Sequence, residues 1–361
     1  MADGTKIEWA DATLNYVNGC SVFSPGCTNC YAMKLAGTRL KHVPSRAGLT
    51  QDSKAGPVWT GEVRANEAAL MDALRWKRGR RIFWNAHGDL FHEAVPDEWI
   101  DRLFAVCALT PQHTHMILTK RSARMRAWFA ALRDRGDVFA EHSDWIADVL
   151  GLDDGAYVPE ARDFPLPNVW LGVSVEDQQR ADERIPDLLA TPAAKRFLSC
   201  EPLLGPVDLR DFMWPVCKSM PARFKSWDEA EAAGELTYKR QALVSAQAVF
   251  LDWVIAGGES GSRARPMHPD WARGLRDQCQ AAGVPFFFKQ WGCCLLGNMD
   301  GEDEHGNAAY EIEDVAQPLD YDKLGRGKLI QAHGCDFIRF HRAKATGRML
   351  DGREWNEVPH G

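Results

Sequence analysis

Three cysteines near the amino terminus are the residues whose types and spacing most clearly indicate chemistry. Cys20, Cys27 and Cys30 follow the pattern Cys-x6-Cys-x2-Cys, in a loop that also contains glycine and proline. Thiolates this close together can converge on one metal centre. Three of them would leave one iron of a [4Fe–4S] cluster without a protein ligand. Because a catalytic centre needs an open coordination position, the motif favours a catalytic iron–sulfur site.

A structural zinc site is the alternative interpretation of the same cysteines. Zinc usually takes four ligands from two close pairs. The chain offers one close pair, Cys27 and Cys30, and no second Cys-x2-Cys or His-x3-His follows it. The spacing favours a cluster, and a single distant fourth ligand for zinc stays open.

The composition is that of a globular protein with a substantial core. The 361 residues are 45% hydrophobic and 26% charged. The chain contains no apolar run of about 18 residues, so we predict no membrane-spanning helix. The amino terminus has no basic segment followed by an apolar stretch, so we expect no signal peptide and a cytoplasmic location. We also expect a monomer. Most of the other cysteines are expected to be buried small hydrophobes, with Cys293 and Cys294 as weaker ligand candidates.

The charge is unevenly distributed along the chain. The formal net charge of −7 argues against a generally basic nucleic-acid binder. Two basic clusters stand out nevertheless: Arg75, Lys77, Arg78, Arg80 and Arg81, and then Lys120, Arg121, Arg124, Arg126, Arg133 and Arg135. Each is either a phosphate-binding patch or a solvated helix face.

Short apolar runs alternate with longer helical patterns through most of the chain. We expect buried strands near 81–86, 115–119, 168–174, 196–199, 253–257 and 284–289, and helices near 66–77, 97–109, 121–135, 181–190 and 269–282. This alternation predicts an α/β fold, a partial and about six-stranded parallel β/α barrel of the TIM type. It would occupy residues 1–291, with inserts near 136–163 and 206–248. Residues 292–361 would form an acidic loop and a carboxyl-terminal extension packed on the barrel.

Polar residues follow the predicted strands where each strand ends. In a parallel barrel these ends meet at one rim, where functional groups gather. The residues concerned include Asn85, His87, Asp89 and His92, then Lys120, then Ser174 and Glu176, then Glu201, and finally the segment 257–263. Each has a structural alternative. Glu176 or Asp177 would suit a helix amino terminus, the pair Lys120 and Arg121 would suit internal ion pairs, and the segment 257–261 would suit a tight turn.

The cysteine loop resembles that of radical S-adenosylmethionine (SAM) enzymes, closest to the branch of spore photoproduct lyase. Gly19-Cys20 and Cys30-Tyr31-Ala32 are similar to the residues that open and close the motif there, although the common spacing in that branch is Cys-x3-Cys-x2-Cys. Further similar segments are 85–91, 118–121, 172–176 and 201–203. The whole chain also resembles an uncharacterised phage-associated family with a three-cysteine motif, on segments 6–9, 88–92, 118–121, 257–261 and 347–352.

The resemblance implies a mechanism. Cys20, Cys27 and Cys30 would bind a [4Fe–4S] cluster, and SAM would chelate the fourth iron and yield a 5′-deoxyadenosyl radical. The candidates for holding SAM are Tyr31, Asn85, Asp89, Lys120, Ser174, Glu176 and Glu201. The implied partners are a flavodoxin- or ferredoxin-type electron donor and a nucleobase, nucleotide or nucleic acid as substrate. A small metabolite or peptide substrate, or a non-enzymatic metal protein that binds nucleic acid, are the alternatives.

Overall fold

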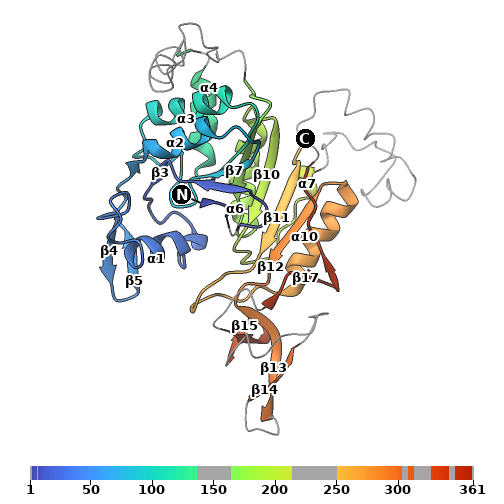
Figure 1. The fold of residues 1–361 in the computed structure, drawn as a ribbon. Helices are drawn as coiled ribbons and strands as arrows, with labels where there is room; N and C mark the ends of the chain where they lie inside the picture. Colours follow the sequence, from blue (N-terminus) through green and yellow to red (C-terminus); the bar gives the residue numbers. More distant parts are fainter. Residues whose placement is uncertain are drawn as a thin grey trace, which may run out of the picture.

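The computed structural model is built on one mainly parallel sheet. It describes residues 2–5, 7–132, 134–135, 164–213, 250–302, 308–312, 327–340 and 346–359. The strand order is β1-β2-β7-β8-β9-β10-β11-β12. All neighbours from β2 to β12 are parallel, and β1 pairs antiparallel with β2. The seven parallel strands form a partial barrel, which confirms the predicted α/β fold class (Figure 1).

The elements of this sheet agree closely with the predicted segments. The strands are β1 (Ala2–Asp3), β2 (Ala12–Leu14), β7 (Arg81–Trp84), β8 (Thr114–Thr119), β9 (Val169–Ser174), β10 (Lys195–Cys200), β11 (Trp253–Gly257) and β12 (Phe286–Gln290). The helices are α2 (Glu67–Arg75), α3 (Asp97–Leu109), α4 (Ser122–Leu132), α6 (Gln178–Ala190), α7 (Arg210–Met213) and α10 (Pro269–Ala282). The sequence analysis missed β2, because three residues are too few to show a strand pattern.

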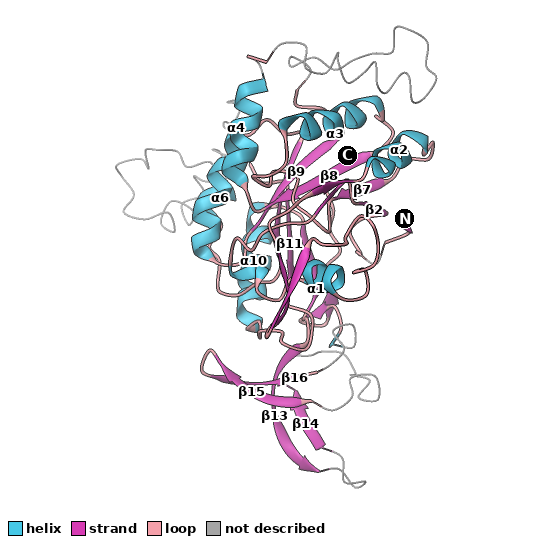
Figure 2. Ribbon diagram, turned by 90° about the vertical axis from the view of Figure 1, so that its left-hand side faces the viewer, coloured by secondary structure: helices cyan, strands magenta, loops and turns pink. Residues whose placement is uncertain are grey.

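Alternate residues of each strand face two different cores. On one face, residues such as Ile82, Leu171 and Val254 pack against the helices (Figure 2). On the other face the side chains form a separate layer of large apolar residues: Trp9, Phe83, Met116, Trp170, Phe197, Trp253, Ile255 and Phe287. This explains why the strands are apolar at nearly every position, as expected of parallel strands covered on both faces.

Smaller elements surround the sheet. β3 (Val17–Asn18) pairs with β6 (Arg64–Ala65), and β4 (Thr50–Ser53) pairs with β5 (Gly56–Trp59). The 3₁₀ turn η1 (Pro25–Cys27) and α1 (Tyr31–Gly37) follow β3. Figure 1 shows α1, β4 and β5 beside the sheet as one protruding group. We call residues 31–65 the α1 lobe.

Residues 292–361 differ from the loop that the sequence analysis expected. β13 (Cys294–Glu302), β14 (Ala308–Ile312), β15 (Lys328–Ala332) and β16 (Cys335–Arg339) form an antiparallel sheet in the order β14-β13-β16-β15. Acidic residues hid this pattern, because an exposed antiparallel sheet carries polar side chains on its outer face. The hairpin of β17 (Met349–Leu350) and β18 (Arg353–Glu354) lies next to β12, where Phe288 N donates to Trp355 O at 2.9 Å.

Two further expectations lie largely or wholly outside the described residues. The insert at 136–163 falls wholly outside them, and the insert at 206–248 is described only to residue 213. The division of the chain at residue 291 stays a prediction. Among the described residues, no helix is long and apolar enough to cross a membrane.

Trp253 is the residue on which the apolar layer should depend most. Its ring lies 6.1–6.2 Å from those of Trp9, Trp170, Phe197 and Phe287, and its side chain is fully buried. We expect Trp253→Ala to lower the free energy of unfolding by about 3–5 kcal/mol, because it leaves a cavity among four rings. Denaturant unfolding measures this. Leu329→Ala, at an exposed position of β15, is the control and should change the free energy by less than about 0.5 kcal/mol. Equal losses in the two variants would contradict the proposed role of Trp253.

Candidate active site

The cysteine loop is held at its first residue by close backbone packing. Gly19 has a φ of +93°, and a Cβ there would lie 2.2 Å from Glu62 O. Its amide donates to His87 O at 3.0 Å, and Cys20 O accepts from Gly61 N at 3.2 Å. Only glycine fits this position. Cys20 therefore lies between the α1 lobe and the segment that follows β7.

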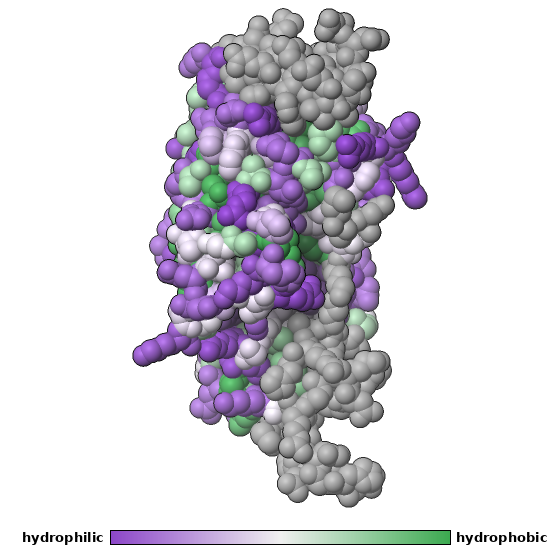
Figure 3. All heavy atoms as spheres, turned by 60° about the vertical axis from the view of Figure 1, so that its left-hand side comes forward, coloured by the Kyte–Doolittle hydropathy of each residue, from purple (hydrophilic) through white to green (hydrophobic). Residues whose placement is uncertain are grey.

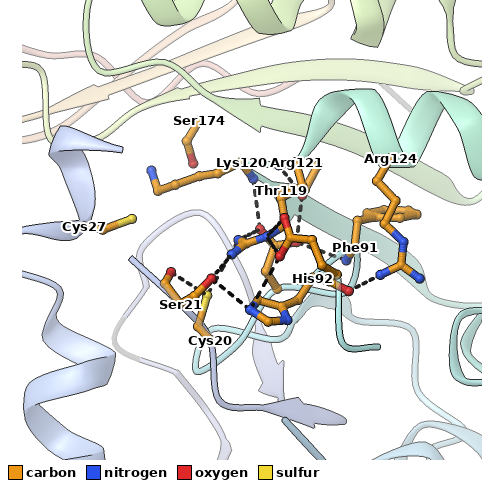
Figure 4. A network of polar contacts seen from close by, with 12 residues as sticks. Cys20, Ser21, Cys27, Phe91, His92, Thr119, Lys120, Arg121, Arg124 and Ser174 are labelled. Atoms are coloured by element: carbon orange, nitrogen blue, oxygen red, sulfur yellow. Dashed lines mark hydrogen bonds and ion pairs between the residues drawn. The ribbon is translucent and has the colours of Figure 1, made fainter. Parts of the chain in front are cut away.

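Arg121 connects Cys20 to the carboxyl ends of β7 and β8. Its guanidinium is 3% exposed, donates to Asp89 Oδ2 at 3.1 Å, and contacts Cys20 Sγ at 3.7 Å and Ser21 Oγ at 2.7 Å (Figure 4). It also donates to both carboxylate oxygens of Glu93 at 3.0 Å. A buried guanidinium with this many acceptors is fixed in orientation, and it fixes the residues around it.

Asp89 is equally saturated. Its Oδ1 accepts from Phe91 N at 3.0 Å and Thr119 Oγ1 at 2.7 Å, and its Oδ2 accepts from Lys120 N at 3.0 Å as well as from Arg121. The residue is 5% exposed. In this structure Asp89 joins the ends of β7 and β8 and orients Arg121.

Glu176 performs the same task between the cysteine loop and β9. Its Oε1 accepts from Ser24 Oγ at 2.7 Å and Lys120 Nζ at 2.5 Å, and its Oε2 accepts from Arg184 Nη1 at 3.0 Å. The side chain is fully buried. Gly26 lies directly against it, since a Cβ there would be 2.4 Å from Oε1. Asp177 caps α6 by accepting from Arg180 N at 3.0 Å, so the helix-capping alternative applies to Asp177 and not to Glu176.

The last part of the loop is held by the segment after β11. Glu259 accepts from Asn29 Nδ2 at 2.8 Å and from Arg265 Nη2 at 2.6 Å, and Arg265 Nη2 also donates to Pro25 O at 2.9 Å. Tyr31, the first residue of α1, donates its hydroxyl to Ala86 O at 2.9 Å. The loop is thus tied to the ends of β7, β8, β9 and β11.

The three thiols are candidate ligands for a zinc ion or for an iron–sulfur cluster, which place different demands on them. In the part of the chain that the structure describes, no three Cys, His, Asp or Glu side chains are arranged to hold one metal ion. Zinc requires its thiolates about 2.3 Å from one point. In a cluster each thiolate binds a different iron, so the thiols need not converge on one point. His87 Nδ1 contacts Arg46 at 3.1 Å, and His92 Nε2 contacts Ser21 Oγ at 2.9 Å.

Burial favours the protonated form of Cys20 and Cys30. Burial, together with the neighbouring Asp89, raises the pKa of Cys20 to about 12, although Arg121 opposes this rise. Burial also raises the pKa of Cys30. Ligation needs thiolates, so a metal centre that bound here would release protons.

The remaining predicted residues lie on the same rim in different settings. Asn85 adopts a φ of +59°, and its Oδ1 accepts from Val17 N at 2.8 Å, whereas its buried Nδ2 has no partner among the described residues. Ser174 ends β9 and is 4% exposed. Glu201, just after β10, pairs with Lys289 Nζ at 2.9 Å and keeps 14% of its side chain exposed.

Sequence reasoning did not single out several residues that organise the site. Ser21, Ser24 and Arg184 belong to this group. Glu259 lies in the segment 257–263 that the sequence analysis placed at the rim, and its pairing with Arg265 is seen only in the structure. Arg184 was not detectable, because nothing in the sequence shows that a residue of α6 reaches back to the preceding strand end.

A family model matches almost the whole of this chain. The family is described as "Protein of unknown function (DUF5131)", and the match covers residues 4–359. The chain belongs to this family. The description of DUF5131 names no activity, and the phage association stays a prediction. No curated protein matches this DUF5131 member.

Solved structures of spore photoproduct lyase are similar to this DUF5131 chain at a distance. The complex with dinucleoside spore photoproduct has a TM-score of 0.34 and 9% identity, covering 94% of this chain and 71% of that one. A mutant of that enzyme with bound AdoMet and dinucleoside spore photoproduct has a TM-score of 0.33 and 11% identity, covering 94% and 71%. A similarity this distant says nothing about the reaction.

Removal of the Glu176 charge tests the role of this carboxylate. Burial alone would raise the pKa of Glu176, but Lys120 and Arg184 outweigh it and hold the pKa below its usual value. Glu176→Gln leaves these two cations without a counter-charge, so we expect a loss of about 3–5 kcal/mol in the free energy of unfolding at pH 7. Because the folded pKa is lowered, this loss should be present above the unfolded pKa near 4.5 and shrink as the pH falls below it.

The matched control is Glu183→Gln on α6, the helix that follows Glu176, where the side chain is 51% exposed. It should change the free energy of unfolding by less than about 0.5 kcal/mol. Denaturant titrations of both variants at pH 7 and pH 4 give the comparison. A Glu176→Gln variant as stable as the parent at pH 7 would rule out the anchoring role.

Proposed function

We propose that this protein is an enzyme of the radical SAM type, with Cys20, Cys27 and Cys30 as the three ligands of a [4Fe–4S] cluster. One observation carries the proposal: three thiols lie on a loop fixed over the rim of a parallel β/α partial barrel. Functional groups gather at this rim in such folds. When bound, the cluster and SAM would supply an electron and a 5′-deoxyadenosyl radical.

The chain's own part in this reaction is to place and shield the site. Arg121 puts a fixed positive charge beside Cys20 Sγ, which favours the thiolate form that ligation needs. Glu176 holds Ser24 at the start of η1, and Glu259 holds Asn29 just beyond its end. These contacts fix Cys27 without lending it a charge.

The polar groups proposed to hold SAM divide by accessibility. Lys120 and Glu201 keep 20% and 14% of their side chains exposed, so they are the charged rim groups placed to meet a ligand carboxylate and ammonium. Ser174 offers a hydroxyl, whereas the Tyr31 hydroxyl already donates to Ala86 O. Asp89 and Glu176 are consumed by internal contacts, and we propose that they act by positioning the others. We further propose that the substrate contains a nucleobase.

Anaerobic reconstitution with iron and sulfide tests the cluster. We expect the reduced protein to give a [4Fe–4S]⁺ electron paramagnetic resonance signal that changes when SAM is added. Cys27→Ala should lose the signal and most of the bound iron, because the other two thiols cannot hold a cluster alone. Gly26→Ala should lose part of both, because its methyl group displaces η1 from Glu176.

Cys335→Ala is the control, because Cys335 lies in β16 and contacts His268. It should keep the iron content and signal of the parent. Circular dichroism shows that each variant is folded. Stoichiometric zinc with no cluster signal in the parent would reject the radical mechanism and leave a structural metal site.

A further inference from the structure

The positive charges that the sequence shows as two clusters are either paired with carboxylates or lie at the far end of the sheet. In the cluster that begins at Lys120, each described member is paired with a carboxylate: Lys120 with Glu176, Arg121 with Asp89 and Glu93, Arg124 with Asp97, Arg126 with Asp187, and Arg135 with Asp101. Arg265 is paired with Glu259. The cluster at 75–81 precedes β7 and therefore lies at the opposite end of the parallel sheet from the cysteines.

The α1 lobe carries the free positive charge on the cysteine side. Residues 31–65 contain six Lys or Arg and two Asp or Glu, a net charge of +4 in a chain whose net charge is −7. Lys34, Arg39 and Lys54 are exposed and form no hydrogen bond or ion pair with any described residue. In a space-filling view of this side, hydrophilic side chains cover much of the described surface (Figure 3).

The lobe is in direct contact with the cysteine site. Its small core of Ala32, Met33, Ala36, Leu49 and Trp59 packs against Cys20 and Cys30. Arg46 reaches His87 after β7 at 3.1 Å, and Arg263 after β11 reaches Ala55 O at 3.0 Å. A ligand bound along the lobe would therefore end at the rim.

Exposed aromatic rings lie where the lobe meets the rim. Phe23 and Tyr31 are 49% and 52% exposed, and only Val22 and Leu329 are comparably exposed large apolar residues in the described part of the chain. The guanidiniums of Arg121 and Arg184 lie 4.8 and 5.7 Å from the centre of the Phe23 ring. These cation–π contacts hold the ring in place while half of it stays exposed.

We propose that the α1 lobe binds the phosphate backbone of a single nucleic-acid strand, and that Phe23 and Tyr31 stack on its bases. Unpaired cations beside exposed aromatic rings are the combination with which proteins hold single strands, because every base has a face that can stack. An acidic protein partner would contact the cations of the lobe, but it would give the exposed rings of Phe23 and Tyr31 no function. The inference that a bound base is a substrate rests on the proposed function; the binding does not.

The test uses the full chain without reconstituted cluster, so that it is independent of radical chemistry. Fluorescence anisotropy measures binding of labelled 20-nucleotide single strands of DNA and of RNA between 50 and 200 mM salt. We expect Lys34→Gln/Arg39→Gln/Lys54→Gln to weaken binding at least tenfold at 50 mM salt. The slope of log K against log salt should fall by about 2, because three phosphate contacts are lost.

The matched control is Arg75→Gln/Lys77→Gln/Arg78→Gln, which removes the same charge from exposed positions at the other end of the sheet. It should weaken binding less than twofold. Phe23→Ala should weaken binding of single strands about fivefold or more and leave the salt slope unchanged. Binding of either DNA or RNA supports the proposal, and the comparison of the two shows which strand is preferred.

Three results would overturn the inference: no salt-dependent binding by the parent, equal weakening by the two triple variants, or binding of a small acidic protein such as a flavodoxin in place of both nucleic acids. SAM cleavage by reconstituted protein is measured separately. Absent cleavage with intact binding would reject the proposed function and leave the binding surface standing.

Discussion

A fully buried carboxylate, Glu176, is the contact on which the candidate site depends. It brings together Ser24 of the cysteine loop, Lys120 after β8 and Arg184 of α6. A charge without solvent is tolerated only when it is neutralised and hydrogen-bonded. The loop is therefore bound to the sheet by an electrostatic requirement of the core. If Glu176 loses its partners, the fold and the placement of Cys27 should suffer together.

The same requirement explains the distribution of charge over the molecule. At the rim, the acids Asp89, Glu176, Glu201 and Glu259 are each paired with a cation. The rim is consequently close to neutral, because its acids are paired with its cations. Free positive charge remains in the α1 lobe, which has its own small core and few acids. The rim therefore holds the cysteines in place, and the α1 lobe beside it carries the charge that would attract an anionic partner.

The sequence predicted the sheet well because the signals were local. Helices 97–109 and 269–282 have the predicted bounds, since Pro96 and Pro269 mark their starts and Gly283, with a φ of +63°, ends the second. Polar residues after each strand identified the rim for the same reason. The roles of these residues could not be predicted, because they depend on contacts between distant segments. Arg184 and Glu259 illustrate this. So does the cluster from Lys120 to Arg135, because each of its described members is paired with a carboxylate.

The longer first gap of the cysteine motif has a physical use in this structure. Ser21, Phe23 and Ser24 all lie between Cys20 and Cys27, and each contacts a buried charged residue. Ser21 contacts Arg121, Phe23 contacts Arg121 and Arg184, and Ser24 contacts Glu176. A loop with three residues in this gap could not make all of these contacts and still place Cys27 on η1. The six-residue gap thus makes the loop longer but lets it form these contacts with buried charged residues, and it places an exposed aromatic ring beside the cysteines. Loop length, cysteine placement and the surface offered to a ligand are in this way one structural property.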